Sequence, residues 1–497
     1  MKSKEWLTGY FCIVLILVCA IGAMTYFIDP YFHYHYPHTD KFYYELSNER
    51  YQNDGIIKQF DYDAVITGTS MTELFKTSEM DALFGTQSIK VPYSGATYKE
   101  INDNLENALR YHPELKMVVR GLDMNRFLAK RDEMRYEPKE YPIYLYNRNP
   151  IDDVKYLLNR DAILNICYML TKDSMGITEP GITSFDEYVF WQHNYTFGIH
   201  TVCPDGIASS GQEETGNHLS SEDKLIIKEN IEANVTSLAK EYPNVTFYYF
   251  FTPYSALWWA DLKTSNGWIR QIEAEQYVIE LLLGYDNIRL YSFNNRTDIT
   301  TDLNHYKDTL HYAAWINSLM LKWMHDGEYL LTKDNYMDYL EEERAFYAAF
   351  DSESLNGQED YECDDYAAAL LNQELCGVEP LNLAMFPADV SDEEVLMDGC
   401  RVFVQNIDAY KYLTFYAEGT EGGQILAEIF DEEGEVLAEI AAYDDLGEKQ
   451  EWRQYLLNIS HIEGNVTICV HGSIVDGEAP SDELKASDAT LRDVYLY

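Results

Sequence analysis

Residues 63–74 read DAVITGTSMTEL, and the fold follows from the pattern of this stretch. Asp63 to Thr69 is a short apolar run that ends at Gly-Thr, as a buried strand does. Residues 71–84 then carry apolar positions at the spacing of a helix. A strand followed at once by a helix is the unit from which parallel sheets are built, and Ser70 stands at the junction.

The same alternation continues on both sides of a long insertion at residues 126–217. We expect further strands at residues 88–93, 115–122, 245–251 and 288–291, and helices at residues 98–111, 221–242, 269–283 and 311–325. Apolar strands that alternate with helices predict a parallel sheet covered on both faces. Residues 29–330 are therefore predicted to form a three-layer α/β/α domain, in which sites lie at the carboxyl ends of the strands.

The pattern changes after residue 330. Residues 331–380 carry acidic clusters such as GQEDYECDD and are predicted to form a linker. Residues 381–497 contain short runs of alternating polarity, such as RVFVQNI and GQILAEIF. These runs predict a C-terminal antiparallel β-sandwich. A carbohydrate-binding module and a spacer are both compatible with such a domain.

The N-terminal segment is predicted to cross a membrane. Trp6 to Ile28 is a run of 23 uncharged residues, long enough at about 1.5 Å per residue to span a hydrocarbon core of about 30 Å. Lys2 and Lys4 precede the run, so the N-terminus is expected in the cytoplasm and the rest of the chain outside. The competing interpretation is a cleaved signal peptide, whose apolar core is usually only about 7–15 residues long. We therefore predict that residues 1–28 form a single-pass anchor in the cell membrane.

The composition excludes several classes of function. The chain has 37 Lys and Arg residues against 84 Asp and Glu residues, a net charge of −47. Because so acidic a surface repels nucleic-acid phosphates, we expect no nucleic-acid partner. The cysteines and histidines fall in no zinc-binding pattern, and no acidic run matches a calcium loop. We expect neither a metal nor a cofactor.

Two motifs carry candidate catalytic chemistry. Ser70 lies where the first strand meets the first helix, so its backbone N–H lies at a positive helix terminus suited to an oxyanion. Asp308 and His311 are three residues apart, which lets the carboxylate reach Nδ1 and leaves Nε2 to accept a proton from a serine hydroxyl. A plainer interpretation of each remains: Ser70 as a helix cap, and His311 as a surface residue beside a cap.

The order of these motifs resembles that of the SGNH (GDSL-like) hydrolase superfamily, which has a flavodoxin-like α/β/α fold and includes lipases, esterases and acyl-transfer proteins. Gly68-Thr69-Ser70 matches the nucleophile block, and Asp308 to His311 matches the Asp-x-x-His block. The resemblance covers about residues 60–326. It implies that Ser70, His311 and Asp308 are catalytic. It also implies that the N–H groups of Ser70 and Gly95 hold the oxyanion.

One departure from the family bears on activity. The third block, Gly-x-Asn in the family, reads Gly121-Leu122-Asp123 here. A carboxylate beside an oxyanion repels it, unless burial keeps the acid protonated. The resemblance implies that Asp123 lies in the oxyanion hole, with Asn125 or Asn194 as alternative amide donors.

The insertion and the domain order point to a substrate class. Residues 191–194 read WQHN, and we expect Trp191, His193 and Asn194 to bind substrate. An anchor followed by an outward SGNH-like domain resembles the D-alanyl transfer proteins of teichoic-acid modification and the alginate O-acetylation proteins. This implies an extracytoplasmic serine esterase or O-acyltransferase acting on acyl esters of cell-envelope polysaccharide or a teichoic-acid-like polymer. The alternative is a non-catalytic surface protein that binds glycan or protein through a degenerate SGNH domain.

Overall fold

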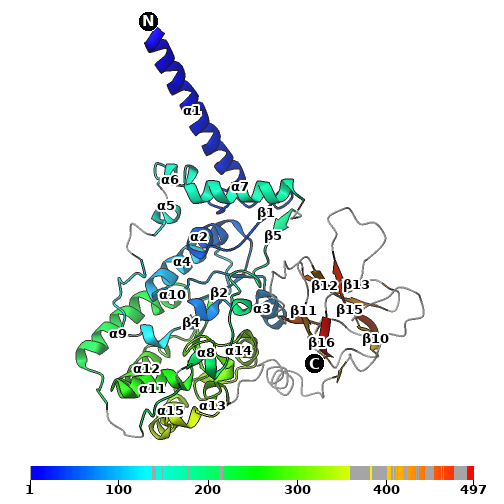
Figure 1. The fold of residues 1–497 in the computed structure, drawn as a ribbon. Helices are drawn as coiled ribbons and strands as arrows, with labels where there is room; N and C mark the ends of the chain where they lie inside the picture. The colour runs from blue at the N-terminus through cyan, green and yellow to red at the C-terminus, as the bar shows by residue number, and fades with distance from the viewer. Residues whose placement is uncertain are drawn as a thin grey trace. The chain divides into compact units, whose positions relative to one another are not determined.

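The computed structural model describes residues 2–358 except 137–140, 148, 177, 179, 205 and 212–215. Beyond residue 358 it describes residues 381–382, 400–404, 407, 410, 412–418, 423–431, 434, 436–442, 453–459, 462, 464–474 and 490–496. The chain divides into two units, Met1–Tyr361 and Glu362–Tyr497 (Figure 1). Both candidate catalytic motifs belong to the first unit.

A six-stranded sheet forms the centre of the first unit. Its strands run in the order β3 (Ser88–Lys90), β2 (Ala64–Thr67), β4 (Met117–Leu122), β6 (Thr246–Phe251), β7 (Ile288–Ser292) and β8 (Leu330–Leu331). The first five strands are parallel, and β8 runs antiparallel to β7. Every residue of β2 and β4 is buried, which explains their mostly apolar sequences. The mostly parallel sheet agrees with the predicted α/β class.

Helices pack in two groups around this sheet. The first group contains α2 (Glu49–Gln59), α4 (Tyr98–Tyr111), α9 (Ser221–Asn234) and α12 (Trp268–Leu282), which contact one another in that order, and the second contains α3 (Thr77–Phe84) and α14 (Ala314–Asp326). The chain leaves β2 through α3 to reach β3, and returns through α4 to β4 on the other side of β2 (Figure 1). The strand order therefore reverses at β2. Ligand sites of open α/β sheets lie at the carboxyl ends of strands at such a reversal.

Three predicted helices have different bounds in the structure. The helix expected at residues 71–84 is a 3₁₀ turn, η1 (Ser70–Thr72), followed by α3. The helix expected at residues 221–242 is divided at Val235 into α9 and α10 (Thr236–Glu241). The helix expected at residues 311–325 begins only at Ala314. The side chain of Asp308 accepts the N–H groups of Leu310 and His311, which explains why these two residues stay outside the helix.

The insertion forms several short helices, and a further helix follows β8. The insertion contains α5 (Ile143–Tyr146), α6 (Val154–Leu157), α7 (Arg160–Ser174), α8 (Ile199–Val202) and β5 (Gly181–Ile182), and β5 pairs with β1 (Tyr43–Tyr44). Within the segment expected to be a linker, residues 336–349 form α15 (Tyr336–Ala349), which packs on α11 (Ala256–Thr264) and α12. Lys263 of α11 is buried and donates to three carbonyls at the end of α15, those of Tyr347, Ala348 and Phe350. Residues 359–380 of that segment lie outside the described residues.

The second unit is built from antiparallel strands. One sheet has the order β10 (Cys400–Val404), β15 (Val466–Ile474), β12 (Gly423–Phe430) and β13 (Val436–Ala442), and the other has the order β14 (Arg453–Asn458), β11 (Tyr412–Glu418), β16 (Thr490–Leu496) and β9 (Leu381–Asn382). Gly434, between β12 and β13, has a φ of 85°, a conformation that favours glycine. A carbohydrate-binding role for this unit stays a prediction.

The N-terminal helix α1 (Lys2–Ile28) is long and apolar enough to cross a membrane, and no other helix of the described chain meets that test. The helix ends at Asp29, which has a φ of 49°. The Asp29 carboxylate accepts the backbone N–H groups of His33, Tyr34 and His35 at 2.7–3.1 Å. A short polar side chain that tolerates positive φ and binds the following backbone is what ends the helix here.

Candidate active site

Ser70 lies directly beyond the carboxyl end of β2. Gly68 has a φ of 155°, and a Cβ at this position would come within 2.6 Å of the Thr72 side chain, so a larger residue would not fit without rearrangement. Thr69 caps η1, because its Oγ1 accepts the N–H of Met71 at 3.4 Å. Since Thr69 is the cap, the hydroxyl of Ser70 is available for another partner.

That partner is His311. The Ser70 Oγ lies 2.8 Å from His311 Nε2, and His311 Nδ1 lies 2.8 Å and 3.0 Å from the two carboxylate oxygens of Asp308. A proton on Nδ1 that is donated to Asp308 leaves Nε2 as the acceptor for the Ser70 hydroxyl. The structure therefore brings the three residues predicted to be catalytic into one hydrogen-bonded chain.

A tight turn holds Asp308 and His311 in place. Tyr306 and Tyr312 form an isolated antiparallel bridge, and the Lys307 N–H donates to the His311 carbonyl at 3.0 Å. Burial alone would raise the pKa of Asp308, but hydrogen bonds from the His311 ring and from backbone N–H groups hold that pKa below its ordinary value. Asp308 is therefore ionised at neutral pH, as an acceptor for the imidazole must be.

The two predicted oxyanion donors lie on neighbouring loops. The Tyr93 N–H donates to the Gly68 carbonyl at 2.8 Å, which ties the loop after β3 to the loop after β2. Gly95 has a φ of 63°, a conformation that favours glycine. Within the described part of the chain, the N–H groups of Ser70 and Gly95 make no hydrogen bond, so both can donate to a ligand.

Asp123 is buried and both of its carboxylate oxygens are engaged. One accepts the Thr69 hydroxyl at 2.8 Å and the other accepts the Tyr254 hydroxyl at 2.7 Å. Burial raises the pKa of Asp123, against the lowering effect of these two hydrogen bonds. Asp123 thus links the nucleophile loop to the loop after β6. In this arrangement Asp123 donates no hydrogen bond toward Ser70. The family resemblance leads us to expect an amide donor at this position.

Of the residues expected to bind substrate, Trp191 reaches the triad. Its ring meets the His311 ring edge to face at a centroid distance of 5.6 Å. The Lys307 ammonium lies 3.7 Å from the centroid of Trp191 and 3.6 Å from that of Tyr195, so the insertion holds a cation in the turn that carries Asp308 and His311. Asn194 is exposed and so is Asn125. The side chain of His193 lies outside the described residues.

A buried pair of glutamates beside the site was not predicted. Glu49 accepts the Ser94 N–H at 2.6 Å, and its carboxyl shares a hydrogen bond with that of Glu73. Burial raises the pKa of both groups, and the neighbouring charge of Glu73 raises that of Glu49 further. Glu73 lies close enough to His311 to feel its charge. No local pattern marks the pair, because one residue belongs to α2 and the other follows η1.

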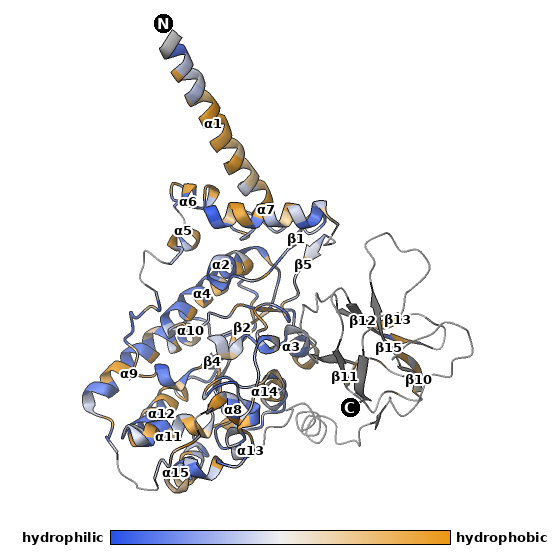
Figure 2. Cartoon of the chain, viewed as in Figure 1, coloured by the Kyte–Doolittle hydropathy of each residue, from blue (hydrophilic) through white to orange (hydrophobic). Residues whose placement is uncertain are grey.

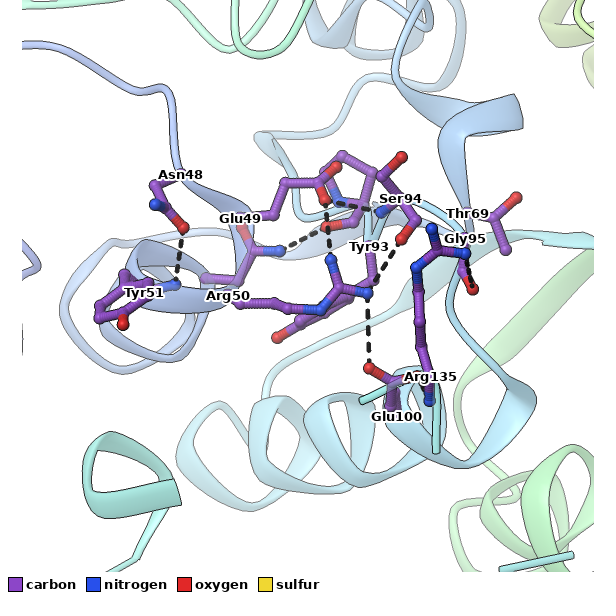
Figure 3. Close-up of polar contacts among 12 residues, drawn as sticks. Asn48, Glu49, Arg50, Tyr51, Thr69, Tyr93, Ser94, Gly95, Glu100 and Arg135 are labelled. Atoms are coloured by element: carbon purple, nitrogen blue, oxygen red, sulfur yellow. Dashed lines mark hydrogen bonds and ion pairs between the residues drawn. The ribbon is translucent and has the colours of Figure 1, made fainter. Parts of the chain in front are cut away.

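Three arginines, here called the arginine cluster, surround the loop that carries Gly95. Arg50 donates to the Ser94 carbonyl at 2.9 Å, and Arg135 donates to the Gly95 carbonyl at 3.3 Å (Figure 3). Arg126 donates to the same Gly95 carbonyl at 3.3 Å. Arg126 also lies near enough to the buried carboxyl of Asp123 to lower its pKa, against the larger effect of burial. The guanidinium groups of Arg126 and Arg135 therefore meet at the Gly95 carbonyl in a chain of net charge −47.

Buried Glu100 fixes part of this cluster. One of its oxygens accepts the backbone N–H of Arg135 at 2.9 Å, and the other lies 3.4 Å from the guanidinium of Arg50 (Figure 3). The Arg135 guanidinium lies over Gly95 so closely that a Cβ there would be 2.1 Å from its Nη1. The absence of a side chain at Gly95 thus serves the approach of Arg135 as well as the backbone conformation.

Among the described residues no group of three or more His, Cys, Asp or Glu side chains could hold a metal ion. No protein-family model matches the chain, and no curated protein does.

Solved structures match the chain only distantly. A structure assigned as a platelet activating factor of Streptococcus pneumonia is 13% identical, with a TM-score of 0.28, and the match covers 56% of this chain and 90% of that one. The capsular polysaccharide assembling protein CapF of Staphylococcus aureus is 12% identical, with a TM-score of 0.13, over 82% of this chain and 95% of that one. Such TM-scores carry no argument about function.

Proposed function

We propose that this chain is a membrane-anchored, extracytoplasmic serine esterase or O-acyltransferase of the SGNH type. The observation that carries the proposal is the hydrogen-bonded chain from Ser70 through His311 to Asp308 at the carboxyl end of β2. A serine, a histidine and a carboxylate linked in this order are the arrangement used for acyl transfer on several unrelated folds.

In the proposed reaction, Ser70 Oγ attacks the carbonyl carbon of an acyl ester while His311 Nε2 takes the hydroxyl proton. The N–H groups of Ser70 and Gly95 donate to the oxyanion. The intermediate collapses when His311 returns the proton to the leaving alcohol, and the acyl group stays on Ser70. A second hydroxyl, from water or from a glycan, then gives its proton to His311 and attacks the acyl carbon of the acyl-enzyme. The bond between the acyl carbon and Ser70 Oγ breaks, and His311 returns the proton to Ser70 Oγ.

The arginine cluster supports an anionic polymer as the substrate. Arg126 and Arg135 present guanidinium groups to the loop that carries the proposed oxyanion donor, and Lys307 adds a third cation over the Trp191 ring that packs on His311. Guanidinium groups bind carboxylates and phosphates with paired hydrogen bonds. The substrate class we infer is therefore an acylated uronate-containing polysaccharide or a phosphate-containing, teichoic-acid-like polymer of the cell envelope.

The location follows from α1 and its flanking charges. If α1 crosses the cell membrane with Lys2 and Lys4 in the cytoplasm, both units lie on the outer side, where such polymers are. The antiparallel second unit is proposed to bind the polymer or to space the first unit from it.

The test is covalent labelling of the full-length chain with a fluorescent fluorophosphonate, which reacts with an activated serine. We expect labelling of the native chain and its loss in Ser70→Ala. Ser265→Ala, which removes an exposed hydroxyl at the end of α11, is the matched control and should label as the native chain does. Labelling that persists in Ser70→Ala, or that never occurs, would contradict the proposal.

One observation favours a second candidate, a non-catalytic surface protein that binds a glycan. Asp123 stands where an amide donor is expected, and both its oxygens accept hydroxyl protons instead. A site without its third donor stabilises an oxyanion less. This candidate takes precedence if no ester is turned over while an acidic polysaccharide still binds.

A further inference from the structure

The helix α7 presents an apolar surface that the first unit leaves uncovered. Exposed residues recur along it at positions 164, 167, 168, 171 and 175, a spacing that places them on one face of a helix of 3.6 residues per turn. Leu164, Tyr168 and Met175 are 58%, 52% and 67% exposed. The Thr171 hydroxyl donates a hydrogen bond to the Cys167 carbonyl at 2.7 Å, so it needs no other partner.

The opposite face of α7 packs on the protein. Ala162, Ile166 and Met169 are buried, and Ala162 belongs to an apolar cluster with Tyr31, Leu145 and Tyr156. The helix is therefore apolar on two opposite sides, of which only one is used within the unit. Large apolar side chains in a contiguous exposed stripe mark an interaction surface rather than ordinary surface residues.

Neighbouring segments extend this surface. Ile143, Ile151, Val154 and Leu158, in or beside α5 and α6, are between 41% and 79% exposed. Together with Leu164, Tyr168 and Met175 they make up what we call the apolar platform.

The position of α1 beside the platform indicates that a membrane covers the platform. Both α6 and α7 contact α1, and a Cβ at Gly22 of α1 would lie 3.8 Å from the Cβ of Leu157 in α6. Figure 1 shows α7 crossing the foot of α1, with the sheet on the side away from α1. Figure 2 shows hydrophobic residues over most of α1 and on part of α7. The platform therefore lies where the apolar helix enters the folded unit.

The length of the exposed part of α1 agrees with a position of the platform at the membrane surface. Residues 4–20 of α1 are all exposed, whereas burial begins at residues 21–28, beside α6 and α7. At about 1.5 Å per residue, 17 exposed residues extend about 26 Å, close to the hydrocarbon thickness of about 30 Å. If α1 spans the bilayer, α6 and α7 lie at the boundary between acyl chains and headgroups.

We propose that α5, α6 and α7 form a membrane-surface platform that inserts Leu164, Tyr168 and Met175 into the outer leaflet beside α1. A helix with an apolar face of this kind lies in the interface plane with that face in the acyl-chain boundary. We expect apolar side chains rather than charge to bind the platform, because Lys155 is paired with Asp152, Arg160 with Asp161, and the Lys172 ammonium lies 4.5 Å from the centroid of the Tyr168 ring. The platform fixes the height and tilt of the first unit above the membrane. This inference rests on the membrane anchorage in the proposed function.

The test uses the full-length chain in phosphatidylcholine vesicles, with an environment-sensitive NBD probe on one cysteine and serine at the other cysteine positions. The probe is placed at Leu164→Cys, at Leu225→Cys and at native Cys12. Leu225 on α9 is the matched control, since it is 56% exposed against 58% for Leu164. Lipids brominated near the carbonyl end or near the methyl end of the acyl chains report the depth of each probe.

We expect the probe at residue 164 to be quenched about twofold or more by shallow bromines relative to the probe at residue 225, independently of salt. Adding Leu158→Lys and Met175→Lys should return the probe at residue 164 to an aqueous spectrum, with an unchanged circular dichroism spectrum as the folding control. Equal quenching of the probes at residues 164 and 225 overturns the platform. The platform is also overturned if the probe at residue 164 is shielded from water in detergent and light scattering shows a dimer, since a second copy of the chain would then cover the surface.

The probe at Cys12 separates this inference from the anchorage. Strong quenching at Cys12 by deep bromines together with an aqueous residue 164 means that α1 spans the bilayer and the platform is wrong. An aqueous Cys12 means that the anchorage in the proposed function has failed, and the platform falls with it.

Discussion

The hydroxyl of Thr69, the residue before the nucleophile, donates to the buried carboxylate of Asp123 at 2.8 Å. Asp123 also accepts the Tyr254 hydroxyl, so it joins the loops that follow β2, β4 and β6. Asp123 therefore holds the loop that carries Ser70. In the proposed function an oxyanion forms at this loop, and a negative charge on Asp123 would oppose it, so the two substitutions of Asp123 should have opposite effects.

Asp123→Asn should keep kcat/KM for 4-nitrophenyl acetate at or above the native value near pH 7, with an increase of up to about tenfold. It removes a charge that opposes the oxyanion and retains one acceptor for the two hydroxyls. Asp123→Ala should lower kcat/KM and destabilise the chain by about 1–3 kcal/mol, because two buried hydroxyls lose their acceptor. Steady-state kinetics and urea unfolding measure both effects. Equal losses of activity in the two variants would show that the carboxylate itself is needed.

Asp308→Asn should lower kcat/KM by about 10³–10⁴-fold with little loss of stability, because an amide that donates to Nδ1 leaves Nε2 protonated and unable to accept from Ser70. Asp302→Asn is the matched control, since Asp302 and His305 form a second Asp-x-x-His pair in the same segment, with a buried histidine. Its effect on kcat/KM should stay within about threefold. Losses of similar size in the two variants would remove Asp308 from the triad.

Arg135→Gln should reduce kcat/KM for the anionic ester 4-nitrophenyl hydrogen succinate by about tenfold, the equivalent of about 1.4 kcal/mol. The value for neutral 4-nitrophenyl acetate should change little, because the arginine cluster is proposed to bind a charge on the substrate. Arg110→Gln, which breaks an exposed pair with Glu106 on α4, is the control. If Arg135→Gln lowers kcat/KM equally for the two esters, the arginine acts on the oxyanion or on the loop, and no site for a substrate anion is needed.

The free energy of unfolding should fall as the pH rises. The size of the fall follows from a second buried pair of carboxyls, Glu275 and Glu343. Burial raises the pKa of Glu275 to about 7 and raises that of Glu343 well above its ordinary value, and the two groups interact. A raised folded-state pKa means that the stability of the pair is fully present below the ordinary value near 4.5 and is lost as the pH rises through 7. The loss between pH 5 and pH 9 should be on the order of 2 kcal/mol.

Glu343→Gln tests that pH dependence, because the neutral amide resembles the protonated acid. The variant should match the native chain at pH 5 and be more stable at pH 9, as measured by urea unfolding. Glu280→Gln removes an exposed carboxylate from α12 and should change neither value. A native chain that is equally stable at pH 5 and pH 9 would mean that the pair is not titrating in this range.

Local patterns in the sequence predicted most of the strands and helices, whereas Ser70, Asp308 and His311 were singled out by the order of their motifs in the resemblance to SGNH hydrolases. Their catalytic role stays a prediction. The run from Asp63 to Thr69 predicts β2 because a buried strand needs apolar residues throughout, and this requirement is met by neighbours in sequence. Three-residue spacing alone lets Asp308 reach His311, and the side chains do meet at 2.8 Å. The length of the apolar run likewise predicts α1, because a helix satisfies its own backbone groups.

The surroundings of the triad depend on contacts that no local pattern records. Glu49 meets Glu73, Arg135 lies over Gly95, and Trp191 packs on His311 only because the sheet brings their loops to one edge. The bounds of α14 could not be predicted either, since its start depends on the side chain of Asp308 rather than on helical spacing.

The sequence by itself determined the strand–helix order, the apolar N-terminal helix and the spacing of Asp308 and His311, because each depends on residues within a turn or two of one another. The tertiary structure decided which of two Asp-x-x-His pairs faces Ser70. It buries His305 and leaves His311 beside the nucleophile, 241 positions away in sequence. It also decided that two guanidinium groups meet at the Gly95 carbonyl in a chain of net charge −47. These contacts between residues distant in sequence depend on how the parallel strands align their ends. The overall composition of the chain carries no information about them.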